Sequence, residues 1–240
     1  EGRPREAIAA INEELAVKAD TDLPASIESD NALLVLDRAT IQQSLAQFDL
    51  SKNDFQAADK AIDLLDISHD ASDTLGKYIF SDDVGRYQAP PYEKLLINTL
   101  NMVNYLEQSD LNGARVEARR LAVMHTYFRD KLKDSENPVL GLGGFLAGLT
   151  FEKSGEIDEA IRWYDTALRY REFAALKNPV RAMLPLGAYR TPRLTAIETE
   201  VAAPAPLGAD EGEIIVLVGY GRVPHKIAKR IPIGLALTYF

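Results

Sequence analysis

"GEIDEAIRWYDTAL", residues 155–168, is the segment that decides the fold class. Its apolar residues recur at intervals of three and four, and its charged residues occupy the other side. This spacing predicts an amphipathic helix, which must bury its apolar side against a neighbouring element. The apolar positions are Ile157, Ala160, Ile161, Tyr164, Ala167 and Leu168.

The preceding residues, 144–154, predict a partner helix. This helix carries the small residues Ala147 and Gly148, and the next helix carries Ala160. Small side chains allow two antiparallel helices to approach closely. We therefore expect a helical hairpin joined by a tight turn at Gly155.

One hairpin cannot bury its apolar side alone, so further hairpins are expected beside it. The sequence predicts one with a polar turn at residues 52–54 and with Ala58 in the place of Ala160. It predicts another with a turn at residues 109–110 and with Ala114 as the small residue. The chain therefore reads as an array of antiparallel helix hairpins.

This pattern resembles the tetratricopeptide repeat, a helix pair with small and aromatic residues at fixed spacing. The resemblance implies a mainly α fold of the α-solenoid type that binds other polypeptides. The other hairpins match less well, and their small residues lie further apart than the roughly 34 residues of a regular array. The residues of the best match are Gly148, Phe151, Ala160, Tyr164 and Ala167.

The composition changes after Tyr189. Residues 190–212 are rich in proline, alanine and glycine and are predicted to be a linker. Residues 213–240 contain two apolar, β-branched runs, which predict a short β-hairpin or strand pair. The sequence thus predicts a helical repeat domain at residues 1–189, a linker, and a β-strand segment that either covers the helices or binds a partner.

Composition excludes several classes of function. The 240 residues carry a net charge of −9 and no basic stripe, so nucleic acid is not an expected partner. The absence of cysteine excludes disulfides and thiolate sites, and the three histidines lack metal-ligand spacing. No cofactor, metal or transmembrane segment is predicted.

A narrower resemblance concerns Tyr92 and Glu93, which open one predicted helix, and residues 116–120, which lie in the next. Together with the repeat-like helices they are similar to a family of uncharacterised bacterial cell-envelope proteins, often predicted lipoproteins. This resemblance implies a periplasmic or cell-envelope location, with the cytoplasm as the alternative. Because the chain begins at Glu1, we expect that an upstream segment was removed, and a signal or lipid-anchor sequence could have been lost with it.

Two candidate sites follow from these predictions. The first is a polar cluster between adjacent helices, which is either a structural ion-pair network or a site for a polar peptide end or small ligand. The second is a groove formed by the first helix of each hairpin, which would bind a partner unless the chain covers it. The polar cluster consists of Tyr92, Glu93, Glu117, Arg119 and Arg120. The groove consists of Gln43, Gln47, Leu96, Thr99, Val103, Leu142, Phe145 and Leu149.

The leading functional hypothesis is a non-catalytic scaffold that binds a protein or peptide through the groove or through the C-terminal strands. The rival hypothesis is an enzyme or small-ligand receptor that uses Tyr92, Glu93, Glu117 and Arg119. A third is a purely architectural subunit that self-associates. No catalytic residue is predicted, because no nucleophile motif frames any serine.

Overall fold

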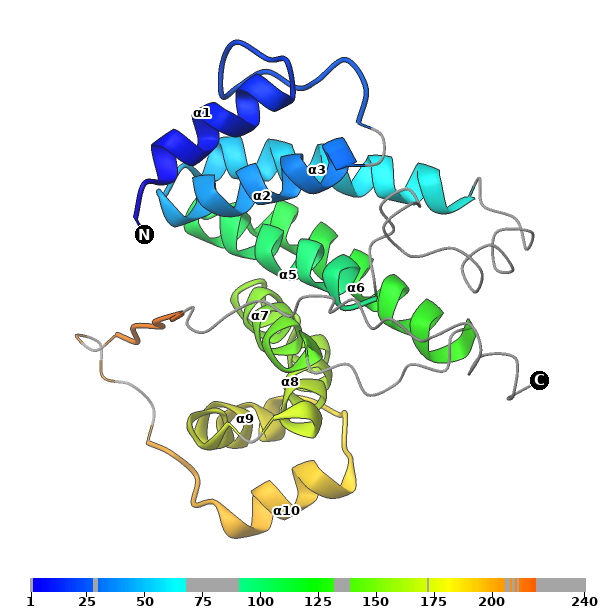
Figure 1. The fold of residues 1–240 in the computed structure, drawn as a ribbon. Coiled ribbons are helices and arrows are strands. Elements are labelled where there is room, and N and C mark those ends of the chain that lie inside the picture. Colours follow the sequence, from blue (N-terminus) through cyan, green and yellow to red (C-terminus); the bar gives the residue numbers. More distant parts are fainter. Residues whose placement is uncertain are drawn as a thin grey trace, which may run out of the picture. The chain divides into compact units, whose positions relative to one another are not determined.

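The computed structural model describes residues 2–27, 30–67, 91–131, 139–171, 173–205, 208, 210 and 212–218. The chain divides into two compact units, Glu1–Pro204 and Ala205–Phe240. The first unit consists of α-helices with short 3-10 turns, and no strand occurs in the described ranges (Figure 1). The prediction of a mainly helical fold is therefore confirmed.

Consecutive helices of the first unit pair into antiparallel hairpins (Figure 1). The pairs are α2 (Asp30–Ser44) with α3 (Phe48–Ile67), α5 (Pro91–Glu107) with α6 (Leu111–Lys131), and α7 (Val139–Lys153) with α8 (Ile157–Tyr170). The hairpins pack in chain order, because α5 contacts both α3 and α7. The first helix, α1 (Pro4–Glu14), packs on α2.

The same turn closes all three hairpins. Ala46, Ser109 and Gly155 have φ angles of 57°, 58° and 75°, in the left-handed region. In each turn the next N–H donates to the carbonyl five residues earlier, at 2.8 to 2.9 Å. This bond belongs to the Schellman motif, which satisfies the last carbonyls of a helix and reverses the chain.

The predicted turn at residues 52–54 is wrong, because these residues lie inside α3. Their polarity has another cause, since Asp54 pairs with Arg38 in the interior. Counting from the observed turns places Ser51, and not Ala58, in the position of Ala160. Ser51 and Ala160 are both fully buried, so the requirement for a small residue at this position is met.

The α7–α8 hairpin brings two helix backbones into contact. A Cβ atom on Gly144 would lie 3.0 Å from the amide nitrogen of Ala167 and 3.1 Å from the carbonyl oxygen of Trp163. One on Gly148 would overlap the ring of Tyr164. The predicted close approach of these helices therefore depends on glycines as well as on alanines.

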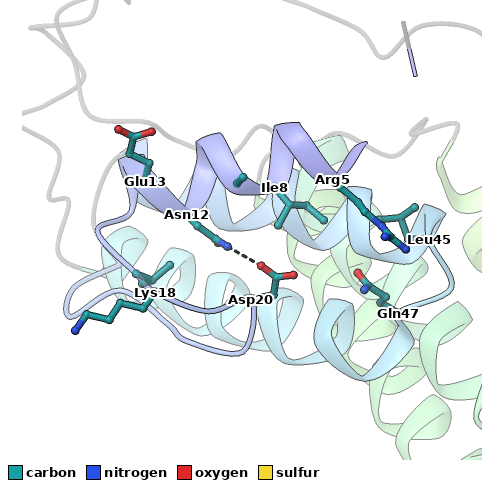
Figure 2. A pocket seen from close by; sticks show the side chains of 10 residues that line it. Arg5, Ile8, Asn12, Glu13, Lys18, Asp20, Leu45 and Gln47 are labelled. Atoms are coloured by element: carbon teal, nitrogen blue, oxygen red, sulfur yellow. Dashed lines mark hydrogen bonds between the residues drawn. The ribbon is translucent and has the colours of Figure 1, made fainter. Parts of the chain in front are cut away.

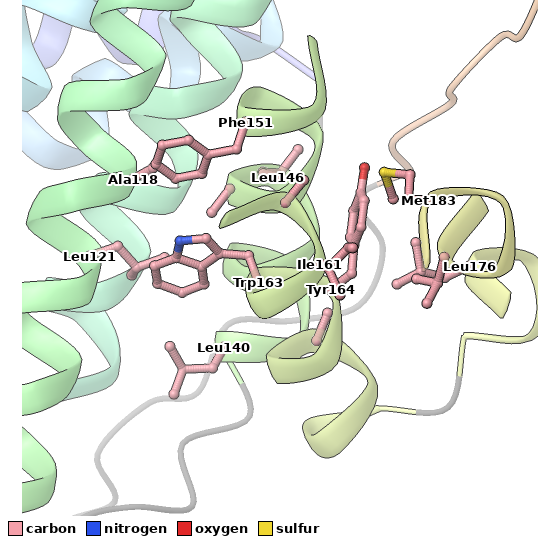
Figure 3. Close-up of a cluster of buried hydrophobic side chains, with 14 of the residues drawn as sticks. Ala118, Leu121, Leu140, Leu146, Phe151, Ile161, Trp163, Tyr164, Leu176 and Met183 are labelled. Carbon is pink, nitrogen blue, oxygen red and sulfur yellow. The ribbon is translucent and has the colours of Figure 1, made fainter. Parts of the chain in front are cut away.

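Two hydrophobic clusters hold the unit together. The larger one extends from α5 to α10, and Figure 3 shows Trp163 of α8 directed toward Leu121 of α6, with Phe151 near Ala118. The smaller one lies among α1, α2 and α3 and includes Ile97 of α5. The helix α5 therefore contributes to both clusters.

The helical unit extends further than predicted. Part of the expected linker at 190–212 forms α10 (Pro192–Glu200), which follows the short α9 (Lys177–Met183). Thr191 caps α10 by accepting a hydrogen bond from the N–H of Leu194, and Pro192 occupies the first helical position. The helix buries Leu194 in the larger cluster, so local helix signals outweigh the linker-like composition.

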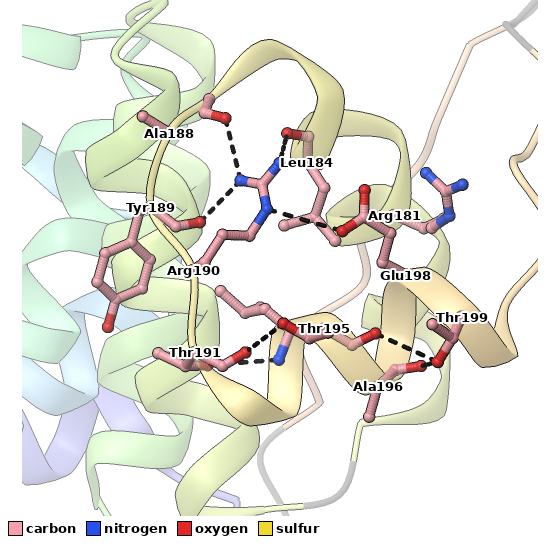
Figure 4. A network of polar contacts seen from close by, with 12 residues as sticks. Arg181, Leu184, Ala188, Tyr189, Arg190, Thr191, Thr195, Ala196, Glu198 and Thr199 are labelled. Carbon is pink, nitrogen blue, oxygen red and sulfur yellow. Dashed lines mark hydrogen bonds and ion pairs between the residues drawn. The ribbon is translucent and has the colours of Figure 1, made fainter.

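Arg190 fixes the approach to α10. Its guanidinium donates to the carbonyl oxygens of Leu184, Gly187 and Tyr189 and lies 3.7 Å from the carboxylate of Glu198 (Figure 4). One side chain thereby binds three backbone carbonyls in and just after the preceding 3-10 turn.

The predicted β-hairpin at 213–240 has no support in the described part of the second unit. Residues 212–218 contain no strand, and the remainder of the predicted hairpin lies outside the described residues. The five consecutive apolar residues 214–218 are all exposed.

We expect Gly144→Ala to destabilise the first unit by about 1–3 kcal/mol, because the backbone of α8 cannot yield to the added methyl group. Thermal or urea unfolding followed by circular dichroism measures this change. Gly141→Ala is the matched control on the same helix, since its Cβ would lie 3.4 Å from Arg171 Cβ, at ordinary contact distance. Equal stability of the two variants would show that α7 and α8 are not packed through Gly144.

Candidate functional site

A row of asparagines lies along one side of α5. Asn98, Asn101 and Asn104 are spaced three residues apart, which places them on one helix face. Each is at most 1 % exposed. Buried amides require hydrogen-bond partners, and these asparagines find theirs on three other helices.

The asparagines form a hydrogen-bonded chain across the first two hairpins. Asn98 Nδ2 and Asn101 Nδ2 each donate to the Glu117 carboxylate of α6 at 3.0 Å. Asn104 Nδ2 donates to Ser51 Oγ of α3 at 2.9 Å. Asn104 Oδ1 accepts from Gln43 Nε2 of α2 at 2.7 Å. We call these six residues the polar seam.

Glu117 is the charged centre of the polar seam. Its side chain is 2 % exposed, and Arg120 Nη1 lies 3.8 Å from the carboxylate. Arg120 Nη1 lies closer to Asp59 Oδ2 of α3, at 2.7 Å, and forms its ion pair there. Burial raises the pKa of Glu117, and the hydrogen bonds from the two asparagines and the charge of Arg120 act against this increase.

The structure brings part of the predicted polar cluster together. Glu117 and Arg120 are neighbours, whereas Arg119 is exposed on the surface of α6. Tyr92 and Glu93 lie in the first turn of α5, where Tyr92 Oη donates to Glu93 Oε1 at 2.9 Å. Glu117 instead contacts the middle of α5, so its nearest partners are the asparagines.

The first turn of α5 has its own electrostatic environment. Burial, followed by the negative charge of Glu93, raises the pKa of Asp37 on α2. Burial and the hydrogen bond to Glu93 raise the pKa of Tyr92. The negative charge of Glu93 therefore affects a carboxyl group on α2.

Several predicted groove residues make contacts within the chain. Gln43 belongs to the polar seam, and Thr99 is fully buried with its hydroxyl donating to the carbonyl of Leu95. Phe145 stacks on Phe173, with ring centroids 6.0 Å apart and planes at 29°. The other members are half-buried or exposed: Gln47, Leu96, Val103, Leu142 and Leu149. A partner-binding role for these residues stays a prediction.

A second polar network anchors α1 and the loop after it. Arg38 is fully buried and donates to both carboxylate oxygens of Asp54 on α3, at 2.7 and 2.8 Å. It also donates to Asn12 Oδ1 on α1 at 2.7 Å and to the carbonyl of Asp22 at 2.8 Å. This guanidinium makes four hydrogen bonds and joins α1, α2 and α3.

Beside this network lies an open cleft of about 700 Å³ (Figure 2). Figure 2 shows Arg5 and Glu13 extending from α1, with Lys18 and Asp20 on the following loop. Asp20 Oδ1 accepts a hydrogen bond from Asn12 Nδ2 at 2.7 Å. The two cations and two carboxylates offset one another, so the cleft favours neither sign of ligand charge.

Sequence reasoning missed the asparagines of the polar seam. Their signal is present as "NTLNMVN", residues 98–104, in which asparagine recurs every third residue on a helix whose other residues are mostly apolar. Three amides on the buried side of a helix predict a hydrogen-bonded interior. The charged partner Glu117 was predicted, but with Tyr92 and Glu93 as its neighbours.

Within the described ranges, no three histidine, aspartate or glutamate residues are placed to hold a metal ion. None of the helices described has an apolar stretch that could span a lipid bilayer. No protein-family model, curated protein or solved structure matches this chain. The function must therefore be inferred from the geometry of the chain itself.

The raised pKa of Glu117 predicts a pH dependence of stability. The folded chain holds this proton more tightly than the unfolded chain, so the contribution of Glu117 to stability falls as the pH rises from 4.5 through the raised pKa. We expect the free energy of unfolding of the wild type to fall in this window relative to that of Glu117→Gln, which does not titrate. Urea unfolding at a series of pH values measures the difference.

Glu117→Ala is the second arm of this experiment. It leaves two buried asparagine donors without their acceptor and should be about 3 kcal/mol less stable than Glu117→Gln at every pH, since neither variant titrates at this position. Parallel stability curves for the wild type and Glu117→Gln would contradict the raised pKa.

Proposed function

We propose that this chain is a non-catalytic scaffold that binds another polypeptide. In this proposal the hairpins are a tetratricopeptide-like α-solenoid, and residues 213–218 add as a β-strand to the sheet edge of the partner. The exposure of residues 214–218 is the observation that carries the proposal.

The segment "EIIVLV", residues 213–218, has the properties of an unpaired strand. Ile214, Val216 and Val218 are 88 %, 73 % and 71 % exposed. Burying each such side chain would contribute about 1.5–3 kcal/mol. β-branched residues favour the extended conformation, and no backbone hydrogen bond of residues 212–218 occurs within the described part of the chain. An exposed apolar segment rich in β-branched residues favours pairing with a sheet edge.

The repeat-like geometry supports the scaffold part of the proposal. All three hairpin turns share one hydrogen-bond pattern, and a fully buried small residue follows each turn residue by five positions. These residues are Ser51, Ala114 and Ala160. A stack of equivalent hairpins is a rigid support from which a flanking segment can be presented.

The groove is the less favoured binding surface. Thr99 and Phe145 pack against other parts of the chain, whereas residues 214–218 remain exposed. The resemblance to bacterial envelope proteins supports a periplasmic or cell-envelope location, which we propose together with the scaffold function, and the cytoplasm is the alternative. A second candidate function, binding of a small ligand, is supported by a pocket beside Asn98.

We expect Val216→Pro to abolish partner capture, because proline lacks the N–H that a strand ladder requires. Val216→Thr is the matched control, since it keeps both the N–H and the β-branched shape. The measurement is affinity capture from bacterial envelope extracts, with circular dichroism to confirm that the helices persist. Capture of the same polypeptides by both variants would rule out strand addition at this segment.

A further inference from the structure

A pocket of about 300 Å³ opens between α3, α5 and α6. It shares no residue with the segment at 213–218. Its lining combines two acceptor groups, two guanidinium groups and three apolar side chains. The lining residues are Asp59, Asn98, Val116, Arg119, Arg120, Val123 and Met124.

Asn98 forms the buried wall of this pocket. Its residue is 1 % exposed, and its Oδ1 atom has no hydrogen-bond partner. The Nδ2 atom is held by Glu117 at 3.0 Å, so a flip of the amide would break that bond. The orientation is therefore fixed, and Oδ1, which has almost no accessible surface, is an acceptor that a ligand N–H satisfies once the side chains that cover it move aside. An unsatisfied buried acceptor destabilises the protein, so a donor at this point gains the corresponding free energy.

The two arginines of the pocket differ in their engagement. Arg120 is paired with Asp59 at 2.7 Å. Arg119 is exposed, and it makes no ion pair among the residues that the structure describes. A guanidinium at the edge of a pocket is suited to a carboxylate, which it can bind through two parallel hydrogen bonds.

The remaining wall is apolar and belongs to α6. Val116 and Val123 are 51 % and 67 % exposed, and they are seven residues apart, on one side of the helix. Met124 lines the pocket beside them and is half-buried. Met is unbranched and adapts to differently shaped apolar groups. This wall therefore suits an aliphatic side chain.

We propose that the pocket binds an aliphatic α-amino-acid unit with a free carboxylate. The N–H of the ligand donates to Asn98 Oδ1, the carboxylate pairs with Arg119, and the side chain contacts Val116, Val123 and Met124. The volume corresponds to the smallest ligand pockets of proteins, which matches a single residue. A phosphate ligand is disfavoured, because the Asn98 acceptor and the Asp59 carboxylate both oppose a multiply charged anion.

Two sources share this chemistry, the free amino acid and the C-terminal residue of a peptide. L-leucine and N-acetyl-L-leucine represent them, and L-leucinamide is the control that lacks the carboxylate. We expect either L-leucine or N-acetyl-L-leucine, the two ligands that carry a carboxylate, to raise the melting temperature of the full chain in a saturable manner. Tighter binding of leucine indicates a free amino acid, and tighter binding of N-acetyl-leucine indicates a peptide end.

Arg119→Gln tests the carboxylate contact and should weaken binding by about tenfold or more in calorimetric titration. Arg129→Gln, at an exposed arginine of the same helix, should bind as the wild type does. Three results would overturn the proposal: no shift with either carboxylate, equal binding of leucinamide, or unchanged affinity of Arg119→Gln. Because Arg119 is exposed, loss of folding is not expected, and the melting curve without ligand checks this.

Discussion

The left-handed residue at each hairpin turn is the constraint on which the helical unit depends. It fixes how many residues separate the last turn of one helix from the first turn of the next, and therefore which sides of the two helices meet. A one-residue shift would rotate the second helix by about 100° and remove the small residue from the contact. Only one of the three positions is glycine, Gly155, whereas Ala46 and Ser109 adopt the same conformation at a higher backbone energy.

The two interfaces between hairpins differ in chemistry. Between the first two, Asn104 of the polar seam bonds to Ser51 and Gln43, beside apolar packing by Ile97. Between the second and third, Thr99 and Leu121 lie within 3 Å of the position of a Cβ on Gly143, so the helices are in close contact. A buried carboxylate contributes less stability than apolar residues of similar volume would. Glu117 also bonds to Asn98, which lines the pocket that we propose as a ligand site.

Strong local signals were sufficient for the fold class but not for its details. The helix at 157–168 follows from periodicity alone, and α8 coincides with it. The polar residues 52–54 were wrongly assigned to a turn. Asp54 is polar because it pairs with Arg38, sixteen positions earlier, and a pairing at this separation cannot be predicted from neighbouring residues alone. The predicted cluster included Glu117, which lies buried, but its asparagine partners could be identified only after the buried face of α5 was known. The stacking of Phe173 on Phe145 depends on a chain reversal that no local pattern contains.

The polar seam also separates the two hydrophobic clusters along the chain. One cluster belongs to α1, α2 and α3 together with Ile97 of α5, and the other to the helices from α5 onward. When water enters an interface, it replaces the hydrogen bonds that are broken but not the apolar contacts. Partial unfolding at the boundary between the two clusters should therefore cost the least free energy. We therefore expect two cooperative segments in the helical unit, whose amide protons exchange with solvent at different rates. An N-terminal segment that detaches as a whole would expose Asn98, and with it the floor of the pocket, without melting the remaining helices.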